Sequence, residues 1–259
     1  MKTVLFAGSM QSGKTTSATA IYAYALTQKG AIPNAQIDST GRMSILFDKE
    51  NNEGIYFDID DQSPEFLEYK DQHTSQYVNH VGFADELKII ASTLFGLDYN
   101  KIIGSNDEKN ENSPIKWADM NATLPANKRK KNAPEFMTNR EFLEVFGTDI
   151  CRSIYTNCLV QSAHKKLLAL NPEIGIIPDC RFTNEFEFFE KNDNTFKIKL
   201  NRNPYKSDAK SENGLAEIDD SRFDLVVPED LSLEDKNNMV INFLLDVGVL
   251  SSQNIEVGK

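Results

Sequence analysis

The feature that most constrains the fold lies at the start of the chain, where residues 4–16 read "VLFAGSMQSGKTT". Gly8, Gly13, Lys14 and Thr15 complete the spacing G-x-x-x-x-G-K-[ST] directly after the apolar run "VLFA". An apolar run followed by such a loop is typical of a buried strand that turns into a helix. Helical spacing then continues through residues 12–29. The order strand, loop, helix predicts an α/β protein.

The same residues predict a binding site for phosphate groups. Glycines let the backbone wrap around an anion, so that several N–H groups and the helix N-terminus face it. Lys14 is expected to contact the β- and γ-phosphates of ATP, and the Thr15 hydroxyl to bind Mg²⁺. The residues expected to hold ATP are Gly8, Ser9, Gln11, Ser12, Gly13, Lys14, Thr15 and Thr16. A chance glycine-rich turn is the alternative, and the order strand, loop, helix argues against it.

Short apolar runs and helical periodicities alternate through the rest of the chain. Strands are predicted at "EIGIIPDCRF", "TFKIKLNRN" and "FDLVVP". Helices are predicted within residues 82–96, 138–146, 149–170 and 232–246, with Thr148 as the N-cap of the third. Helices between short strands indicate a mostly parallel central sheet covered on both faces, which is a three-layer α/β fold.

Three segments are expected to be additions to this core. Residues 36–80 contain two β-rich runs around a polar turn, which predicts an inserted hairpin. Residues 106–135 lack periodicity and contain the run "NKRKKN", which predicts a mobile surface loop. Residues 203–220 are polar and lie between two strands, which predicts a lid segment over the bound nucleotide. With these additions, residues 1–259 are expected to form a single domain.

Charged side chains at the ends of predicted elements are the candidates for chemistry. Asp179 follows the strand "IGIIP" and is placed to bind Mg²⁺ together with Thr15, and Arg181 lies two residues further on. Arginine offers planar paired donors to phosphate, so converging arginines suit the transfer of a charged group. The other basic residues at element ends are Lys88, Arg140, Arg152 and Arg202. The predicted catalytic side chains are Lys14, Arg140, Arg181 and Arg202.

The charge of the chain limits its partners. The net charge of -11 repels a nucleic-acid polymer but allows a small anionic substrate in a local basic pocket. No apolar run is long enough to span a bilayer, so we expect no membrane partner and a cytoplasmic location. Cys151, Cys158 and Cys180 lack the spacing of metal ligands. The oligomeric state stays open, with a homodimer among the alternatives.

Several later stretches carry a family resemblance. The segments "FADELK", "REFLEVFGTDICR", "IIPDCRFTNEFE" and "SENGLAEIDDSRFDLVVPEDLSLEDK" follow the N-terminal loop in this order. In this combination the chain resembles the bacteriophage deoxynucleoside monophosphate kinase family, which is similar to other P-loop nucleoside monophosphate kinases. The resemblance covers nearly the whole chain except the hairpin region and the segment around residues 106–132.

The resemblance implies a P-loop kinase fold and an enzyme that transfers the γ-phosphoryl group of ATP to a deoxynucleoside monophosphate. Mg²⁺ is the implied metal, viral DNA precursor synthesis the implied role, and the host cytoplasm the implied compartment. The residues assigned to the acceptor are Asp85, Lys88, Arg140, Asp179, Arg181 and Glu185, with Arg152 added from its place at an element end. Arg202 begins the lid. Two alternatives stay open: a kinase of another small acceptor, such as dephospho-coenzyme A, and a nucleotide-dependent ATPase that acts as a binding module. The accepted bases also stay open.

Overall fold

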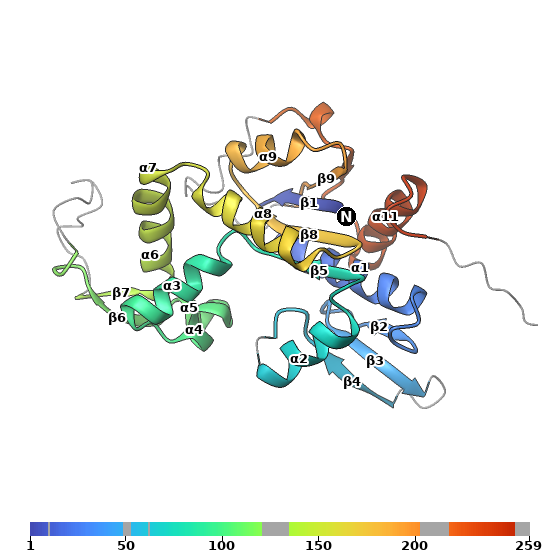
Figure 1. The fold of residues 1–259 in the computed structure, drawn as a ribbon, viewed down its shortest axis with the longest axis horizontal. Coiled ribbons are helices and arrows are strands. Elements are labelled where there is room, and N and C mark those ends of the chain that lie inside the picture. The colour runs from blue at the N-terminus through green and yellow to red at the C-terminus, as the bar shows by residue number, and fades with distance from the viewer. Residues whose placement is uncertain (10, 49–52, 62, 121–134, 203–217, 252–259) are drawn as a thin grey trace, which may run out of the picture. The chain divides into compact units, whose positions relative to one another are not determined.

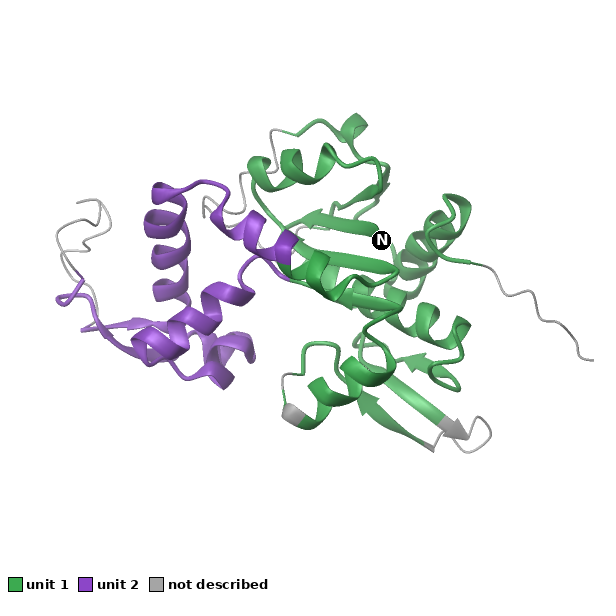
Figure 2. Cartoon of the chain, in the orientation of Figure 1, with its two compact units in different colours: residues 1–81, 166–259 green, residues 82–165 purple. Residues whose placement is uncertain are grey.

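The structure is a computed structural model that describes residues 1–259 except residues 10, 49–52, 62, 121–134, 203–217 and 252–259 (Figure 1). The described chain separates into two units (Figure 2). Unit 1 comprises residues 1–81 and 166–259, and unit 2 comprises residues 82–165. Each unit has its own hydrophobic core. The sequence predicts one domain with insertions, and its patterns do not indicate two units.

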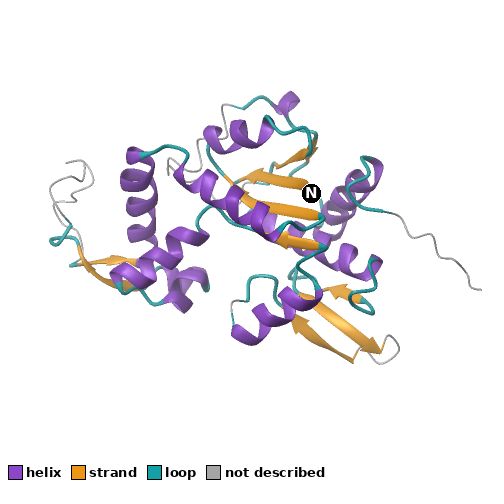
Figure 3. Ribbon diagram, in the orientation of Figure 1, coloured by secondary structure: helices purple, strands orange, loops and turns teal. Residues whose placement is uncertain are grey.

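A five-stranded parallel sheet forms the centre of unit 1 (Figure 3). Its order is β10-β9-β1-β8-β5, and the bounds are β1 (Lys2–Gly8), β5 (Val78–His80), β8 (Ile174–Cys180), β9 (Thr195–Leu200) and β10 (Leu225–Val227). Because the strands are parallel, their carboxyl ends lie along one edge. The chain adds β5 and β8 on one side of β1, then β9 and β10 on the other, so the strand order reverses at β1. The predicted parallel sheet is confirmed.

One face of this sheet packs against the first and last helices of the chain. These are α1 (Lys14–Gln28) and α11 (Leu233–Asp246). Val4 and Phe6 of β1 belong to the core that these helices cover, and both side chains are fully buried. Since side chains alternate along a strand, Val4 and Phe6 point to the same face.

The other face is covered as well. Leu5 of β1 lies between Val4 and Phe6, points the opposite way and is also fully buried. There α8 (Cys158–Leu170) approaches the sheet so closely that a Cβ atom at Gly175 would lie 2.8 Å from Leu167. The helix α9 (Thr183–Glu190) packs against β9. Burial on both faces explains the continuous apolar runs at residues 4–7 of β1 and residues 174–177 of β8.

Unit 1 also contains a small antiparallel sheet, whose strands come between β1 and β5 in the sequence. Its strands are β2 (Ala35–Ile37), β3 (Met43–Asp48) and β4 (Glu53–Phe57), in that order. The strands β3 and β4 pair antiparallel with Met43 opposite Phe57, at the position where the sequence analysis predicts a hairpin. The helix α2 (Pro64–His73), which has proline in its first turn, follows and was not predicted.

Unit 2 is mainly helical. Its core contains side chains of α3 (Asp85–Phe95), α4 (Tyr99–Ile103) and α6 (Asn139–Glu144). The rings of Phe95, Phe142 and Phe146 lie 5.0 to 5.7 Å apart within this core. The helix α3 ends at Gly96, which has φ 74°, as the sequence analysis expects.

Part of the predicted mobile loop has regular structure. The segment contains α5 (Asn106–Lys109) and β6 (Asn112–Lys116), and β6 pairs with β7 (Phe136–Thr138). The loop prediction is therefore wrong for these residues, while residues 121–134 lie outside the described part. The helix is fixed by a capping box between Ser105 and Glu108, which a search for apolar periodicity does not detect. The pairing of β6 joins segments that are distant in sequence, so no local pattern announces it.

The predicted helix at 149–170 is also wrong in its first part. The helix α6 continues as a π-helix (Val145–Cys151), then as α7 (Arg152–Ile154), and α8 begins only at Cys158. Thr148 lies inside the π-helix and caps nothing. The break occurs because Tyr155 adopts an extended conformation, with φ -151° and ψ 109°.

The predicted lid falls mostly on residues 203–217, which lie outside the described residues. The described residues after position 217 include a short 3₁₀-helix, Asp220–Arg222, whose first residue is the last of the predicted lid. Arg222 pairs with Glu190 of α9, with two nitrogen–oxygen distances of 3.1 and 2.5 Å. Among the helices that the structure describes, none is long and apolar enough to cross a membrane.

Candidate functional site

The glycine loop, residues 9–13, joins the carboxyl end of β1 to the start of α1. Gly8 and Gly13 have φ angles of 149° and 97°, in the region that side chains other than hydrogen disfavour. A Cβ atom at Gly8 would lie 2.6 Å from the carbonyl oxygen of Leu200, so the backbone passes directly against the end of β9. Both glycines of the sequence motif are therefore required by the backbone.

The Lys14 side chain folds back over this loop. Its ammonium donates hydrogen bonds to the carbonyl oxygens of Gly8 at 2.7 Å and Ser9 at 2.6 Å. The residue is only 7% exposed, so its charge is held at the loop and does not extend into solvent. A cation fixed at this place is available to an anion that enters the loop.

The first turn of α1 presents hydroxyl and amide groups beside Lys14. Gly13 is the N-cap and has no side chain to bond the free N–H groups of the first turn. The Thr15 side chain is exposed, while that of Thr16 is partly buried next to the turn that contains Gly41. The helix dipole gives this end of α1 a positive potential.

Asp179 and Arg181 lie at the carboxyl end of the neighbouring strand. In the pairing of β1 with β8, Cys180 stands opposite Ala7, next to Gly8 at the end of β1. Burial raises the pKa of the Cys180 thiol well above its usual value. Glu185 and Asp179 raise it further, while the Lys14 charge lowers it. Lys14 and Asp179 therefore lie close enough to act on the same thiol, as expected of residues at one edge.

Glu185 fixes the turn that carries Arg181. Its carboxylate accepts hydrogen bonds from the backbone N–H groups of Arg181 at 2.8 Å and Phe182 at 3.1 Å. The residue is 1% exposed and stands in the first turn of α9. These contacts show a structural task for Glu185, and its predicted contact with the acceptor stays a prediction.

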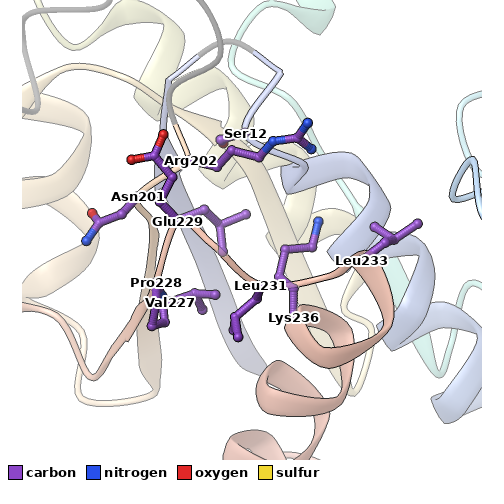
Figure 4. Close-up of a pocket in the computed structure, with 10 residues that line it drawn as sticks. Ser12, Asn201, Arg202, Val227, Pro228, Glu229, Leu231, Leu233 and Lys236 are labelled. Carbon is purple, nitrogen blue, oxygen red and sulfur yellow. The ribbon is translucent and has the colours of Figure 1, made fainter.

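A pocket opens beside the glycine loop, at the carboxyl ends of β9 and β10 (Figure 4). Arg202 and Lys236 line it together with Ser12 of the loop. Its other lining residues are Leu200, Asn201, Val227, Pro228, Glu229, Leu231 and Leu233. The pocket thus combines apolar walls with two cations, and it places the predicted residue Arg202 next to the loop.

Lys236 is the site residue that the sequence analysis misses. It belongs to α11, and its ammonium donates to the Gly13 carbonyl oxygen at 3.2 Å. The neighbouring Asn237 accepts a hydrogen bond from Ser17 of α1 at 3.3 Å, so α11 is held against the start of α1. The signal was available: Lys236 occupies a position of the apolar stripe that continues with Val240 and Leu244.

Four predicted site residues lie in unit 2, whereas the glycine loop belongs to unit 1. These residues are Asp85, Lys88, Arg140 and Arg152. Asp85 accepts from the Gly82 N–H at 2.8 Å and lies 3.6 Å from the Lys88 ammonium. The guanidinium of Arg140 donates to the Asn110 and Asn106 side chains at 3.0 and 2.8 Å. Arg152 donates to the Gly147 carbonyl at 3.4 Å. Each side chain is tied to its own unit, and the predicted roles stay predictions.

The described residues contain no group of three histidine, cysteine, aspartate or glutamate side chains that could hold a metal ion. Searches with protein-family models and among curated proteins find no match to the chain.

Proposed function

We propose that the chain is a phosphotransferase that uses ATP and Mg²⁺ to convert deoxynucleoside monophosphates to diphosphates, for viral DNA precursor synthesis. The observation that carries the proposal is the glycine loop, with the Lys14 ammonium held over the carbonyls of Gly8 and Ser9 at the start of α1. A loop of this kind suits the phosphate chain of a nucleotide, which needs N–H donors and a fixed cation. In this proposal the domain is a P-loop kinase.

The position of the loop in the sheet supports the proposal. Ligands of open parallel sheets bind at the carboxyl edge where the strand order reverses. Here the order reverses at β1, and the glycine loop follows β1 directly. Asp179 is the second-to-last residue of β8, Arg181 directly follows that strand, and Arg202 follows β9. Because β8 and β9 lie on either side of β1, these residues stand at the same edge of the sheet.

The pocket beside the loop suits the nucleoside of ATP. Val227, Pro228 and Leu231 offer apolar walls of the kind that a planar base requires. Arg202 and Lys236 line the same pocket. In this proposal the apolar walls hold the base of one nucleotide, and the two cations hold its phosphates. ATP would then extend from the pocket to the loop.

Oxygen ligands for Mg²⁺ are present at this edge. Mg²⁺ is usually held by one or two protein oxygens together with water and substrate phosphates. The exposed hydroxyl of Thr15 and the half-buried carboxylate of Asp179 fit such a set. When bound, Mg²⁺ neutralises charge on the phosphates.

The transfer itself requires little from the protein beyond alignment and charge. A phosphate oxygen of the acceptor is already a competent nucleophile, so no histidine base is needed. Lys14, Arg181 and Arg202 are proposed to neutralise the charge on the transferred group. Arg140, Arg152, Asp85 and Lys88 are proposed to serve the acceptor, as the family resemblance implies.

An acceptor panel tests the proposal. We expect the purified protein to release ADP from ATP only when Mg²⁺ and a deoxynucleoside monophosphate such as dGMP or dTMP are present. Parallel reactions contain dephospho-coenzyme A, or no acceptor at all. ADP release with dephospho-coenzyme A alone would favour a different small-molecule kinase, and release without an acceptor would favour an ATPase module.

A further inference from the structure

Lys236 is a buried lysine that packing does not explain. It shares the core-facing stripe of α11 with Val240 and Leu244, four and eight residues further on, and it is 6% exposed. Burying an ammonium group costs free energy unless an opposite charge or several acceptors compensate it. An apolar residue at this position would avoid that cost.

The compensation that Lys236 receives is small. An ammonium carries three donors. Within the described residues, its one hydrogen-bond acceptor is the Gly13 carbonyl oxygen at 3.2 Å, and no carboxylate lies within ion-pair distance. That carbonyl already accepts the backbone N–H of Ser17 at 3.0 Å, so it offers Lys236 a shared bond. Two donors of a buried cation are left for another acceptor beside the loop.

The charges around Lys236 come from three other segments. Arg202 follows β9, Glu229 follows β10, and Lys14 begins α1. Burial, and secondarily the Arg202 charge, lower the pKa of Lys236 from 10.5 to about 8. Among the described residues that line the pocket, Arg202 and Lys236 are opposed by the single carboxylate of Glu229. A polyphosphate anion in the pocket would supply further negative charge.

We infer that Lys236 is a second phosphate-binding lysine of the site, whose ammonium holds the Gly13 carbonyl in the free protein and donates to the phosphate chain of a bound nucleotide. The inference rests on the proposed nucleotide site and adds a residue to it. The contact with Gly13 also ties α11 to the glycine loop.

A phosphate bound beside Lys236 would change the protonation of its side chain. A bound anion favours the charged ammonium and raises the pKa of Lys236 above its value of about 8 in the free protein. Near pH 8 part of the free molecules carry a neutral Lys236, so nucleotide binding takes up protons at this pH. Because binding takes up a proton, nucleotide affinity decreases as the pH rises above about 8.

Titration calorimetry of the full chain with ATP and Mg²⁺ at pH 8, in two buffers of different ionisation enthalpy, measures this uptake. We expect wild-type protein to take up protons on binding. Lys236→Met should take up none and bind ATP at least about tenfold more weakly, the scale of one charge-assisted hydrogen bond. The matched control is Lys70→Met: Lys70 is also 6% exposed and donates to a backbone carbonyl, of Ile59, at 3.2 Å. This control should retain both the uptake and the affinity.

The outcomes separate this inference from the kinase proposal. An ATP affinity and a proton uptake that are both the same in wild type and Lys236→Met overturn the inference, and phosphoryl transfer assays judge the kinase proposal independently. Lys236-dependent uptake without transfer to any deoxynucleotide contradicts the kinase and leaves the inference standing. Failure of wild type to bind ATP overturns both. If Lys236→Met does not fold, a wild-type affinity that stays constant from about pH 7 to 9.5 overturns the inference.

Discussion

At the scale of single residues, Lys14 is the side chain on which the proposal depends most. The sequence motif assigns it to the phosphates, and the structure adds that it is 7% exposed and bonded to two loop carbonyls. It therefore does two things: it holds the loop in shape, and it fixes a positive charge there. The shape of the loop and its positive charge therefore both depend on the Lys14 ammonium.

We predict that Lys14→Met reduces phosphoryl transfer at least about a hundredfold, the scale of removing one preorganised donor. The variant should also lose about 1–3 kcal/mol of unfolding free energy, because two loop carbonyls lose their charged donor. Turnover and thermal unfolding measure the two effects. Lys29→Met, directly after the other end of α1, is the control: it loses a surface ion pair with Glu173, so it should keep the turnover and lose less than about 1 kcal/mol of unfolding free energy. Near-normal turnover in a folded Lys14→Met protein would show that the loop does not hold the transferred group.

The residue scale also shows how far the sequence could lead. Gly8, Gly13 and Lys14 were found because their task requires fixed residue types at fixed spacing in one short segment. Lys236 was missed because its partner, Gly13, is more than two hundred residues away. A lysine on the apolar stripe of α11 is a visible anomaly, but the sequence does not say which buried group it meets.

At the scale of elements, the junction of the glycine loop with α1 depends on both glycine and α11. A Cβ atom at Gly13 would overlap the Lys236 ammonium, and the φ angle of 97° disfavours any other side chain. The loop, the first turn of α1 and the second turn of α11 therefore form one packed junction.

We predict that Gly13→Ala weakens ATP binding at least about tenfold, because Lys236 must move and the strained backbone costs about 1–3 kcal/mol. The control is Gly30→Ala after the same helix, where φ is 65° and no atom lies within 4 Å of the added Cβ. Gly30→Ala strains the backbone but meets no neighbouring atom, so it should bind ATP as the wild type does. Calorimetry and thermal unfolding of both variants measure the difference. Equal ATP affinities for the two variants would contradict the close packing at the junction.

Element prediction succeeded where the pattern is local and failed where it is not. The strands β1 and β8 contain short, fully buried apolar runs because both faces of the sheet are covered, and such runs are visible in sequence. The strand β9 instead alternates apolar residues with two lysines, which is the other local pattern of a strand. The break before α8 depends on the conformation of Tyr155, inside a stretch whose composition still favours helix. The pairing of β6 with β7 depends on residues on either side of a long intervening segment.

At the scale of the whole molecule, a chain with a net charge of -11 gathers cations at one edge of its main sheet. Lys14, Arg181, Arg202 and Lys236 all lie at the carboxyl edge in unit 1. Such a local basic site in an acidic chain suits a small polyphosphate better than a nucleic-acid polymer, whose length would meet the acidic surface. The separation into two units was not visible in sequence, because composition does not change where unit 2 begins and ends.

The most direct test of the central claim follows the γ-phosphoryl group itself. Wild-type protein is incubated with γ-labelled ATP, Mg²⁺ and one deoxynucleoside monophosphate at a time, and the products are separated. We predict that the label appears in a deoxynucleoside diphosphate, that it requires Mg²⁺, and that Lys14→Met abolishes the transfer. Label found only in inorganic phosphate, or only in a product made from dephospho-coenzyme A, would contradict the account.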